Sequence, residues 1–361
     1  MTCLFPKRSE NDNRLYGLSG LKVIAMCLIF LWHSDMEKPP VDLGARACEF
    51  FFVAAGFLYA YAHHSRPVPC TAEGVFAYVK RKVASIWPIH FLCMLLTLLY
   101  LPAAQWLCRD GALMAALNLS LIHSFINNPA VYHAFNGVSW FASTIVVCYA
   151  LAPLAGRMMR DGRKAFLFLP GAFAARFMIE WVQTVKPGAF WNVSIHVSPV
   201  VRMLEFTMGM AAGVLFLMLR LRTAKAASAP LMTALEAGAL AVTAALFYAK
   251  QQTWLRAMFI PVFCLLVFVF AFDAGLVSRL FSMRPVQFFS SLQLEFFMLH
   301  QVMFRLIQRF YPTLYAYPKR EFLVCFLLTT LFVLLYKRFV KKPFSALVDR
   351  ALSAAGRFLA L

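Results

Sequence analysis

Residues 20–35 of the chain are GLKVIAMCLIFLWHSD, and the interpretation of the whole sequence starts from this stretch. Its apolar run predicts a hydrophobic helix with a cation, Lys22, near the start and an imidazole, His33, further along. At about 100° per residue the two side chains fall within about 20° of one another on one helix face. The rise between them is roughly 16 Å, about half of a ~30 Å hydrocarbon core. Ionisable groups inside a membrane are costly, so this pair predicts a functional site.

The composition is that of a membrane protein. Of the 361 residues, 61% are hydrophobic and only 14% charged, and the mean hydropathy is +0.69. These values exclude an ordinary soluble domain and predict an all-α, polytopic transmembrane helical bundle. The net charge of +19 is better explained by cytoplasmic loops facing anionic lipid than by a nucleic-acid partner.

Nine cysteines lie mostly within apolar runs and form no Cys-x-x-Cys pair. This pattern predicts neither a disulfide framework nor a metal site, and we expect small buried side chains instead. No bound cofactor is expected either.

Ten apolar runs are candidate spans, and an eleventh, weaker run at 112–126 contains several polar residues. The ten runs are 17–36, 47–62, 83–101, 138–155, 165–182, 199–219, 230–249, 255–272, 288–307 and 321–340. Basic clusters should face the cytoplasm. All of them do so only if 112–126 does not fully cross, which predicts ten spans with both termini cytoplasmic. The alternative of eleven spans would place the cluster 157–164 outside.

One membrane domain accounts for residues 1–361. We expect residues 1–16 to be a cytoplasmic N-terminal segment and residues 341–361 a cytoplasmic tail, because basic residues mark both.

His33 is the candidate catalytic residue. A neutral imidazole in a low-dielectric site is a competent general base for a hydroxyl group. The alternative is a histidine that simply bridges two helices by hydrogen bonds. Asp35 follows closely and offers a partner for the ring.

A basic run, Lys80-Arg81-Lys82, opens the third span from the cytoplasmic side. Topology alone explains such a cluster. The functional interpretation is that it holds the phosphates of an anionic donor together with Lys22.

The second span contains Glu49 near its outer end, followed by a phenylalanine-rich stretch and Gly56. Gly56 predicts a close approach of another helix backbone, as small residues allow in membranes. Glu49 either supports the site or reaches the membrane interface.

Seven segments, in the same order along the chain, resemble the motifs of acyltransferase family 3, a group of bacterial integral-membrane enzymes. The segments are Gly20-Leu21-Lys22 with His33, residues 51–58 (FFVAAGFL), the basic run ending at Pro88, Trp140 to Ser143 with Tyr149 and Pro153, residues 202–209 (RMLEFTMG), residues 293–301 (QLEFFMLHQ) and residues 339–343 (FVKKP). Each motif is weak alone, but together they cover nearly the whole chain.

The chain also departs from the family pattern at five positions. Lys22 and Ser85 stand where arginines are usual, Ala55 replaces a serine, Ile145 replaces a glutamate and Lys341 replaces another glutamate. Lysine keeps the charge at position 22 but loses the bidentate fork of arginine.

The resemblance implies acyl transfer from cytoplasmic acyl-CoA, which we expect to be acetyl-CoA, to a hydroxyl of a surface glycan or its lipid-linked precursor. Lys22, Lys80, Arg81 and Lys82 would hold the donor, and His33 would act as general base or transient acyl carrier. The expected location is the bacterial inner membrane. The alternative is a catalytically silent relative that binds or transports a glycan or lipid carrier.

Further residues are assigned supporting or acceptor-binding roles. Trp140 and Ser143 match family positions. Arg202 and Glu205 are three residues apart and can pair on one helix face, either as a structural ion pair or to bind the acceptor. His300 matches a family histidine but could also close a polar contact between helices. The other histidines are expected to have surface or packing roles.

Overall fold

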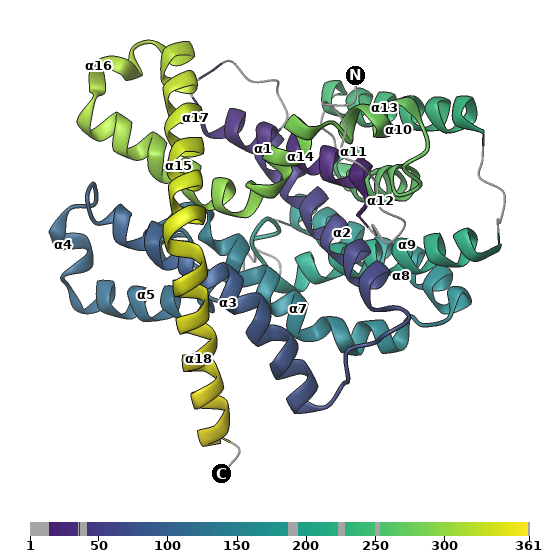
Figure 1. Ribbon diagram of the computed structural model, residues 1–361, viewed down its shortest axis with the longest axis horizontal. Coiled ribbons are helices and arrows are strands. Elements are labelled where there is room, and N and C mark those ends of the chain that lie inside the picture. Colours follow the sequence, from purple (N-terminus) through teal and green to yellow (C-terminus); the bar gives the residue numbers. More distant parts are fainter. Residues whose placement is uncertain are drawn as a thin grey trace.

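The computed structural model describes residues 14–34, 36, 42–186, 194–222, 228–249 and 253–359. Within these ranges the chain is all-helical and contains no strand, as the sequence predicted. Figure 1 shows the helices packed around one another.

The N-terminal half begins with three long helices, α1 (Tyr16–His33), α2 (Leu43–His63) and α3 (Ala72–Thr97). Short elements follow, namely α4 (Ala103–Trp106), α5 (Arg109–Leu119), η1 (His123–Phe125), α6 (Pro129–Tyr132) and η2 (Gly137–Ser139). Three more long helices are α7 (Trp140–Met158), α8 (Gly162–Val185) and α9 (Pro199–Arg222).

The C-terminal half starts with α10 (Ala229–Tyr248), α11 (Thr253–Ala257) and α12 (Phe259–Phe270). The short helices α13 (Leu276–Phe281) and α14 (Arg284–Ser291) lead into α15 (Gln293–Phe310) and α16 (Pro312–Tyr315). The chain ends with α17 (Pro318–Leu335), a π-helical turn η4 (Tyr336–Val340) and α18 (Lys341–Leu359).

Among the described residues, seven helices are long and apolar enough to cross a membrane. They are α1, α2, α7 with η2, α8, α9 as far as Arg220, α10 and the continuous helix Pro318–Gly356. The 11 residues of α5 extend about 16 Å, about half of a hydrocarbon core, so this length favours a segment that does not cross. The count of ten spans and the orientation of the termini remain predictions.

Helix α1 is held at both ends. At its start the backbone N–H groups of Tyr16 and Gly17 donate to the Asp273 carboxylate at 2.9 and 2.6 Å. At its end the Ser34 hydroxyl donates to the Leu31 carbonyl at 2.7 Å. These contacts satisfy backbone groups that a helix terminus leaves unpaired, and they fix the position of His33 in the last turn.

Helices α2 and α9 form the most extensive contact between any two described helices. A Cβ added at Gly56 would lie 1.8 Å from the Phe206 carbonyl oxygen, and one at Gly209 would lie 1.9 Å from that of Val53. Only glycine fits at either position, since the two backbones touch there. The predicted close approach at Gly56 is confirmed.

An ion cluster that is buried except for the partly exposed Arg46 joins α2, α8 and α9. Arg176 on α8 donates to Glu205 at 3.0 Å, to Glu180 at 2.7 Å and to Glu49 at 3.3 Å. Arg202 on α9 donates to Glu205 at 2.5 Å. Arg46 on α2 also pairs with Glu49, so three arginines balance three glutamates. Removing one member would leave a buried charge uncompensated, at roughly 3–5 kcal/mol of stability.

The C-terminal segment from 341 is a helix that packs against α3, and it continues almost straight from α17 (Figure 1). Lys80 on α3 contacts Asp349 at 3.3 Å and donates to the Ser353 hydroxyl at 2.9 Å. Lys341 pairs with Glu295 at 2.5 Å. The predicted tail is therefore a docked helix over its described residues, and its cytoplasmic location stays a prediction.

Candidate active site

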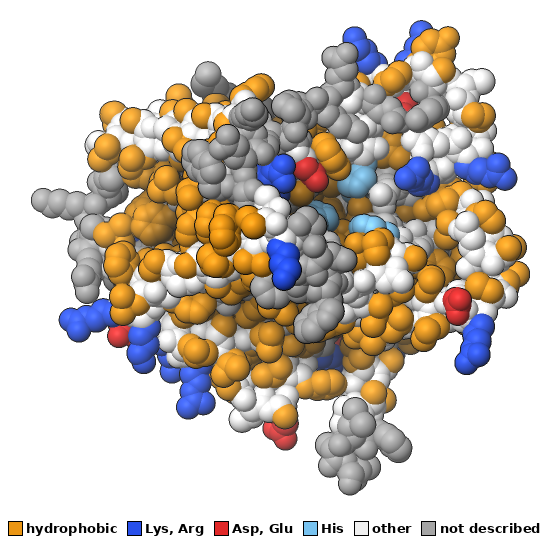
Figure 2. All heavy atoms as spheres, turned by 180° about the vertical axis from the view of Figure 1, so that it is seen from behind, with side chains coloured by type: hydrophobic (Ala, Val, Ile, Leu, Met, Phe, Trp, Pro, Cys, Tyr) orange, Lys and Arg blue, Asp and Glu red, His pale blue; other side chains and the backbone are white. Residues whose placement is uncertain are grey.

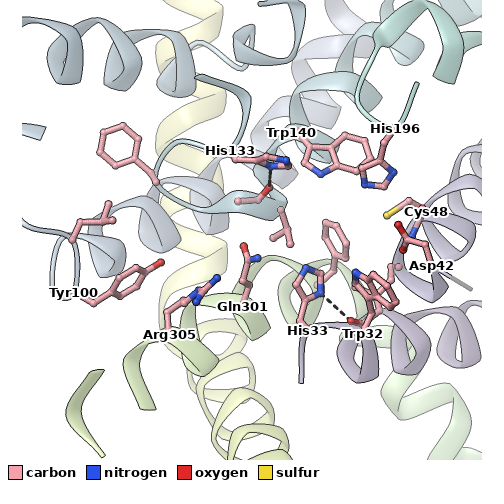
Figure 3. Close-up of a pocket in the computed structure, with 18 residues that line it drawn as sticks. Trp32, His33, Asp42, Cys48, Tyr100, His133, Trp140, His196, Gln301 and Arg305 are labelled. Atoms are coloured by element: carbon pink, nitrogen blue, oxygen red, sulfur yellow. Dashed lines mark hydrogen bonds between the residues drawn. The ribbon is translucent and has the colours of Figure 1, made fainter. Parts of the chain in front are cut away.

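A cavity of about 560 Å³ opens beside the C-terminal end of α1. Its lining includes His33, His133, His196, Trp32, Trp140 and Arg305, and we call it the histidine cavity. Figure 3 shows these side chains arranged around a common space. In Figure 2, histidine side chains gather near the middle of one face, beside an acidic and a basic side chain, while apolar side chains cover much of the rest.

His33 has a defined tautomer. Its Nδ1 lies 3.0 Å from the Ile29 carbonyl oxygen and 3.2 Å from Nε2 of His300. His300 Nδ1 lies 2.6 Å from the Phe297 carbonyl, so this nitrogen carries the proton and Nε2 of His300 is an acceptor. His33 Nδ1–H can donate to both Ile29 and His300. In the neutral ring, Nε2 of His33 then carries the lone pair.

The packing beneath this histidine pair is rigid. The two rings lie edge to face with centroids 4.9 Å apart, and His300 is buried. Phe30, one turn before His33, packs against Phe304 and Phe322 at 4.9 Å each. Such contacts limit the rotamers of the neighbouring side chains, so the base is held in one orientation.

A second cavity of about 520 Å³ lies beside the first half of α1. It is lined by Lys22, Lys82, Tyr78 and Tyr149 together with many apolar residues, and we call it the lysine cavity. The Lys82 ammonium lies 5.3 Å from the Tyr78 ring centroid and 4.9 Å from that of Tyr149, within cation–π range. Phe297 lines both cavities and is therefore part of the wall between them.

Four of the five departures from the family motifs line this same lysine cavity. They are Lys22, Ala55, Ser85 and Ile145, which come from four different helices. The replacements exchange two arginines for Lys22 and Ser85, a serine for Ala55 and a glutamate for Ile145, so one positive and one negative charge are lost from this space. The departures are therefore spatially concentrated, which sequence spacing could not reveal.

The structure separates the four predicted donor-binding cations. Lys22 and Lys82 lie in one cavity, whereas Lys80 is engaged by α18 and Arg81 is exposed. Neither Lys80 nor Arg81 is among the residues that line the lysine cavity.

The predicted supporting residues also have different surroundings. Trp140 lines the histidine cavity. Ser143 is buried, donates to the Leu121 carbonyl at 2.7 Å and contacts the Ser124 hydroxyl at 2.7 Å, so it ties α7 to the η1 segment. Asp35 lies outside the described residues.

Glu49, Arg202 and Glu205 belong to the buried ion cluster and do not line the histidine cavity. Arg202 nevertheless reaches its wall, because its Nε donates to the His196 carbonyl at 2.8 Å and its Nη2 lies 3.3 Å from His196 Nδ1. The predicted Arg202–Glu205 pair is present. The ion cluster therefore contacts the wall of the histidine cavity through Arg202 and does not line the cavity itself.

Sequence reasoning missed His133 and His196, which were expected to have surface or packing roles but line the histidine cavity. Asp42, Gln301 and Arg305 also line it. None of them stands in a recognisable spacing with His33, so only the folded chain brings them together. In contrast, His90 and His123 stack on one another with centroids 6.1 Å apart and line neither the histidine nor the lysine cavity.

Among the described residues, no group of three or more histidine, cysteine, aspartate or glutamate side chains is arranged to hold a metal ion. The charged groups of the two cavities instead suit hydrogen bonding, proton transfer and the binding of an anion.

The all-helical bundle, with long apolar helices around two cavities, defines an integral membrane protein. The chain belongs to acyltransferase family 3, whose acyltransferase-domain model matches residues 15–338. It is also 26% identical over 222 residues to the acyltransferase MdmB of Streptomyces mycarofaciens. That alignment covers 54% of this chain and 56% of the relative, so the chain spans about half the length of the curated protein it matches. No solved structure shows significant similarity.

Proposed function

We propose that this protein is an O-acyltransferase of the bacterial inner membrane. It transfers an acyl group, which we expect to be acetyl, from cytoplasmic acyl-CoA. The acceptor is a hydroxyl of a surface glycan or of its lipid-linked precursor. One observation carries the proposal. His33 and Lys22, on one helix, line two separate cavities that share Phe297 in their wall.

The lysine cavity suits the donor. Lys22 and Lys82 offer positive charge to phosphate groups, and the apolar lining suits the pantetheine arm and the acyl chain. The donor thioester would reach the wall at Phe297, next to the turn of α15 that carries His300.

The histidine cavity suits the acceptor. Trp32, Trp140 and Tyr100 present flat apolar faces, and Gln301 and the histidines present polar groups, which is a suitable lining for a sugar ring. Trp32 has room because residue 44 is glycine, where a Cβ would lie 2.6 Å from the indole ring.

In the proposed reaction, Nε2 of His33 takes the proton of the acceptor hydroxyl as its oxygen attacks the thioester carbonyl. The carbon–sulfur bond breaks, the CoA thiolate leaves, and the imidazolium returns the proton to the sulfur. His300 accepts a hydrogen bond from Nδ1–H of His33 throughout, which keeps Nε2 available as the base. Transient attachment of the acyl group to Nε2 is the other route open to the same geometry.

Mass spectrometry of the host's surface glycans tests the function, by comparing wild type, a deletion strain and His33→Ala. A ~42 Da acetyl increment that disappears in both mutants supports transfer with His33 as base or relay, since the loss of a general base lowers the rate by about 10²–10⁴-fold. Free-thiol release from acetyl-CoA by the purified protein, with and without a membrane glycan fraction, tests the donor. Membrane yield of the variant is the control.

The other outcomes are distinct. If deletion removes the modification and His33→Ala retains it, the enzyme stands but His33 leaves the mechanism. If neither mutant changes any acyl group, a silent binder or transporter of a glycan or lipid carrier becomes the better interpretation.

A further inference from the structure

Two histidines of the histidine cavity are held in opposite tautomers. His33 and His196 both line this cavity. Figure 3 shows His196 beside Trp140, on the other side of the cavity from His33. The two rings are fixed by different partners, a helix carbonyl with a second imidazole for His33 and a guanidinium for His196.

The tautomer of His196 follows from the chemistry of arginine. Nη2 of Arg202 lies 3.3 Å from Nδ1 of His196, and a guanidinium has donors but no acceptor. Nδ1 of His196 must therefore carry a lone pair, so in the neutral ring the proton is on Nε2. Burial and the positive charge of Arg202 also lower the pKa of His196 well below its usual value, so the ring stays neutral.

The position of His196 is tightly defined. Nε of Arg202 holds its backbone carbonyl at 2.8 Å, and the Thr144 hydroxyl donates to the next carbonyl, that of Val197, at 3.0 Å. The Trp140 ring meets the imidazole edge to face with centroids 4.4 Å apart. Arg202 is itself fixed by Glu205 in the buried ion cluster.

We propose that His196 is an acceptor-binding residue whose Nε2–H donates a hydrogen bond to an oxygen of the acceptor, next to the hydroxyl that His33 deprotonates. The cavity then presents Nε2 of His33, which accepts a proton, and Nε2–H of His196, which donates a hydrogen bond. That pair fits an acceptor that carries at least two oxygens, as a sugar does, rather than a simple alcohol. The assignment rests on the proposed function and adds the acceptor class.

Substitution of His196 by glutamine or by asparagine distinguishes the role of its Nε2 from that of its Nδ1. The amide of His196→Gln can place an N–H near the position of Nε2, whereas the shorter His196→Asn reaches only the position of Nδ1. We would measure acetyl transfer from saturating acetyl-CoA as a function of the concentration of a glycan fraction from host membranes. Matched runs would use glycerol, a small acceptor with several hydroxyls, and 1-propanol, a simple alcohol.

The expected result is a change in acceptor affinity alone. His196→Asn should raise the half-saturating glycan concentration about tenfold, as the loss of a buried hydrogen bond predicts, with the maximal rate within about twofold. His196→Gln should stay within about threefold of wild type. Glycerol should be a better acceptor than 1-propanol for wild type, and His196→Asn should remove that preference. His64→Asn, which changes a histidine outside the cavity, is the control.

Two results would overturn the assignment. One is equal behaviour of His196→Asn and His196→Gln, whether both match wild type or both lose maximal rate with unchanged half-saturation. The other is a protonated Nδ1 in ¹⁵N spectra of the histidine-labelled protein in lipid nanodiscs, with His196→Gln used to assign the signal. The spectra need no turnover, so an inactive wild type would refute the proposed function while the tautomer is still decided.

Discussion

The two cavities beside α1 differ in what they offer a substrate. The histidine cavity combines three imidazoles, two indoles, Asp42 and Arg305. The lysine cavity combines two lysines, the His63 imidazole and several tyrosines with otherwise mostly apolar walls. One helix contributes His33 to the first and Lys22 to the second. Under the proposed function, this difference corresponds to a division of labour in which the histidine cavity would handle proton transfer and polar recognition and the lysine cavity would hold an anionic, partly apolar donor.

The contrast also extends to sequence divergence. Four departures from the family motifs line the lysine cavity, while His33 and His300 retain the family residue types. Divergence is therefore concentrated where the proposed donor lies, and the following predictions test whether the two regions are separable.

The largest effect should come from disrupting both regions at once through α2, which lines both cavities. Gly56→Ala would force a Cβ into the Phe206 carbonyl oxygen, so we expect destabilisation of at least about 1–3 kcal/mol and loss of all activity. Thermal unfolding in detergent measures the loss of stability. In Gly238→Ala, where a Cβ meets nothing within 4 Å, stability should rise by up to about 1 kcal/mol, and equal behaviour of the two variants would contradict the packing argument.

The next effect concerns the histidine cavity alone. His300→Ala removes the acceptor for His33 Nδ1–H, so transfer should fall about 10–100-fold with the half-saturating acyl-CoA concentration unchanged. His300→Gln, whose side-chain oxygen can accept the same bond, should restore most of the rate. If the Ala and Gln variants are equally impaired, His300 has a packing role only.

A smaller effect is expected in the lysine cavity. Lys82→Ala should raise the half-saturating acyl-CoA concentration about tenfold, because a charge-assisted contact to phosphate is lost, and leave the acceptor dependence unchanged. Lys80→Ala is the matched control, since Lys80 contacts α18 and should change the value by less than about twofold. If Lys80→Ala raises the half-saturating acyl-CoA concentration more than Lys82→Ala does, the phosphate groups bind on the side of α3 that carries Lys80 and not in the lysine cavity.

The smallest effect tests the wall between the cavities. Phe297→Leu should admit water to the acyl group, because a closed site protects a reactive acyl group from hydrolysis. In the absence of an acceptor, the rate of free-thiol release from acetyl-CoA should therefore rise on the order of threefold. Phe296→Leu removes a buried ring that lines neither cavity and should leave this leak unchanged. Equal leaks in the two variants would show that Phe297 does not separate donor from water.

Much of the fold could be predicted because apolar runs and basic loops are local signals. Helix α1 and the close approach at Gly56 were both expected from residue type and spacing. The weak run 112–126 was expected not to cross, and α5 is short, as that interpretation requires. The docking of α18 on α3 was not predicted, because a basic amphipathic tail carries no signal for its partner.

The site was only partly predictable for a related reason. His33 and Lys22 share one helix, so geometry along the sequence was sufficient to relate them. His196 lies in a turn and gains its role from Arg202, Trp140 and the cavity, which come together only in the folded chain. Likewise, nothing in Lys80-Arg81-Lys82 shows that one lysine meets α18 and the other enters a cavity.

By itself, the sequence determined an all-helical membrane protein of acyltransferase family 3 with an ionisable pair on its first helix, because hydropathy, helical periodicity and motif order are properties of the chain. The tertiary structure decided which side chains share a cavity, which cations contact a neighbouring helix, and which ring nitrogen of His33 and of His196 carries the proton. These properties depend on partners distant in sequence, such as His300 for His33, and such contacts exist only once the helices have packed.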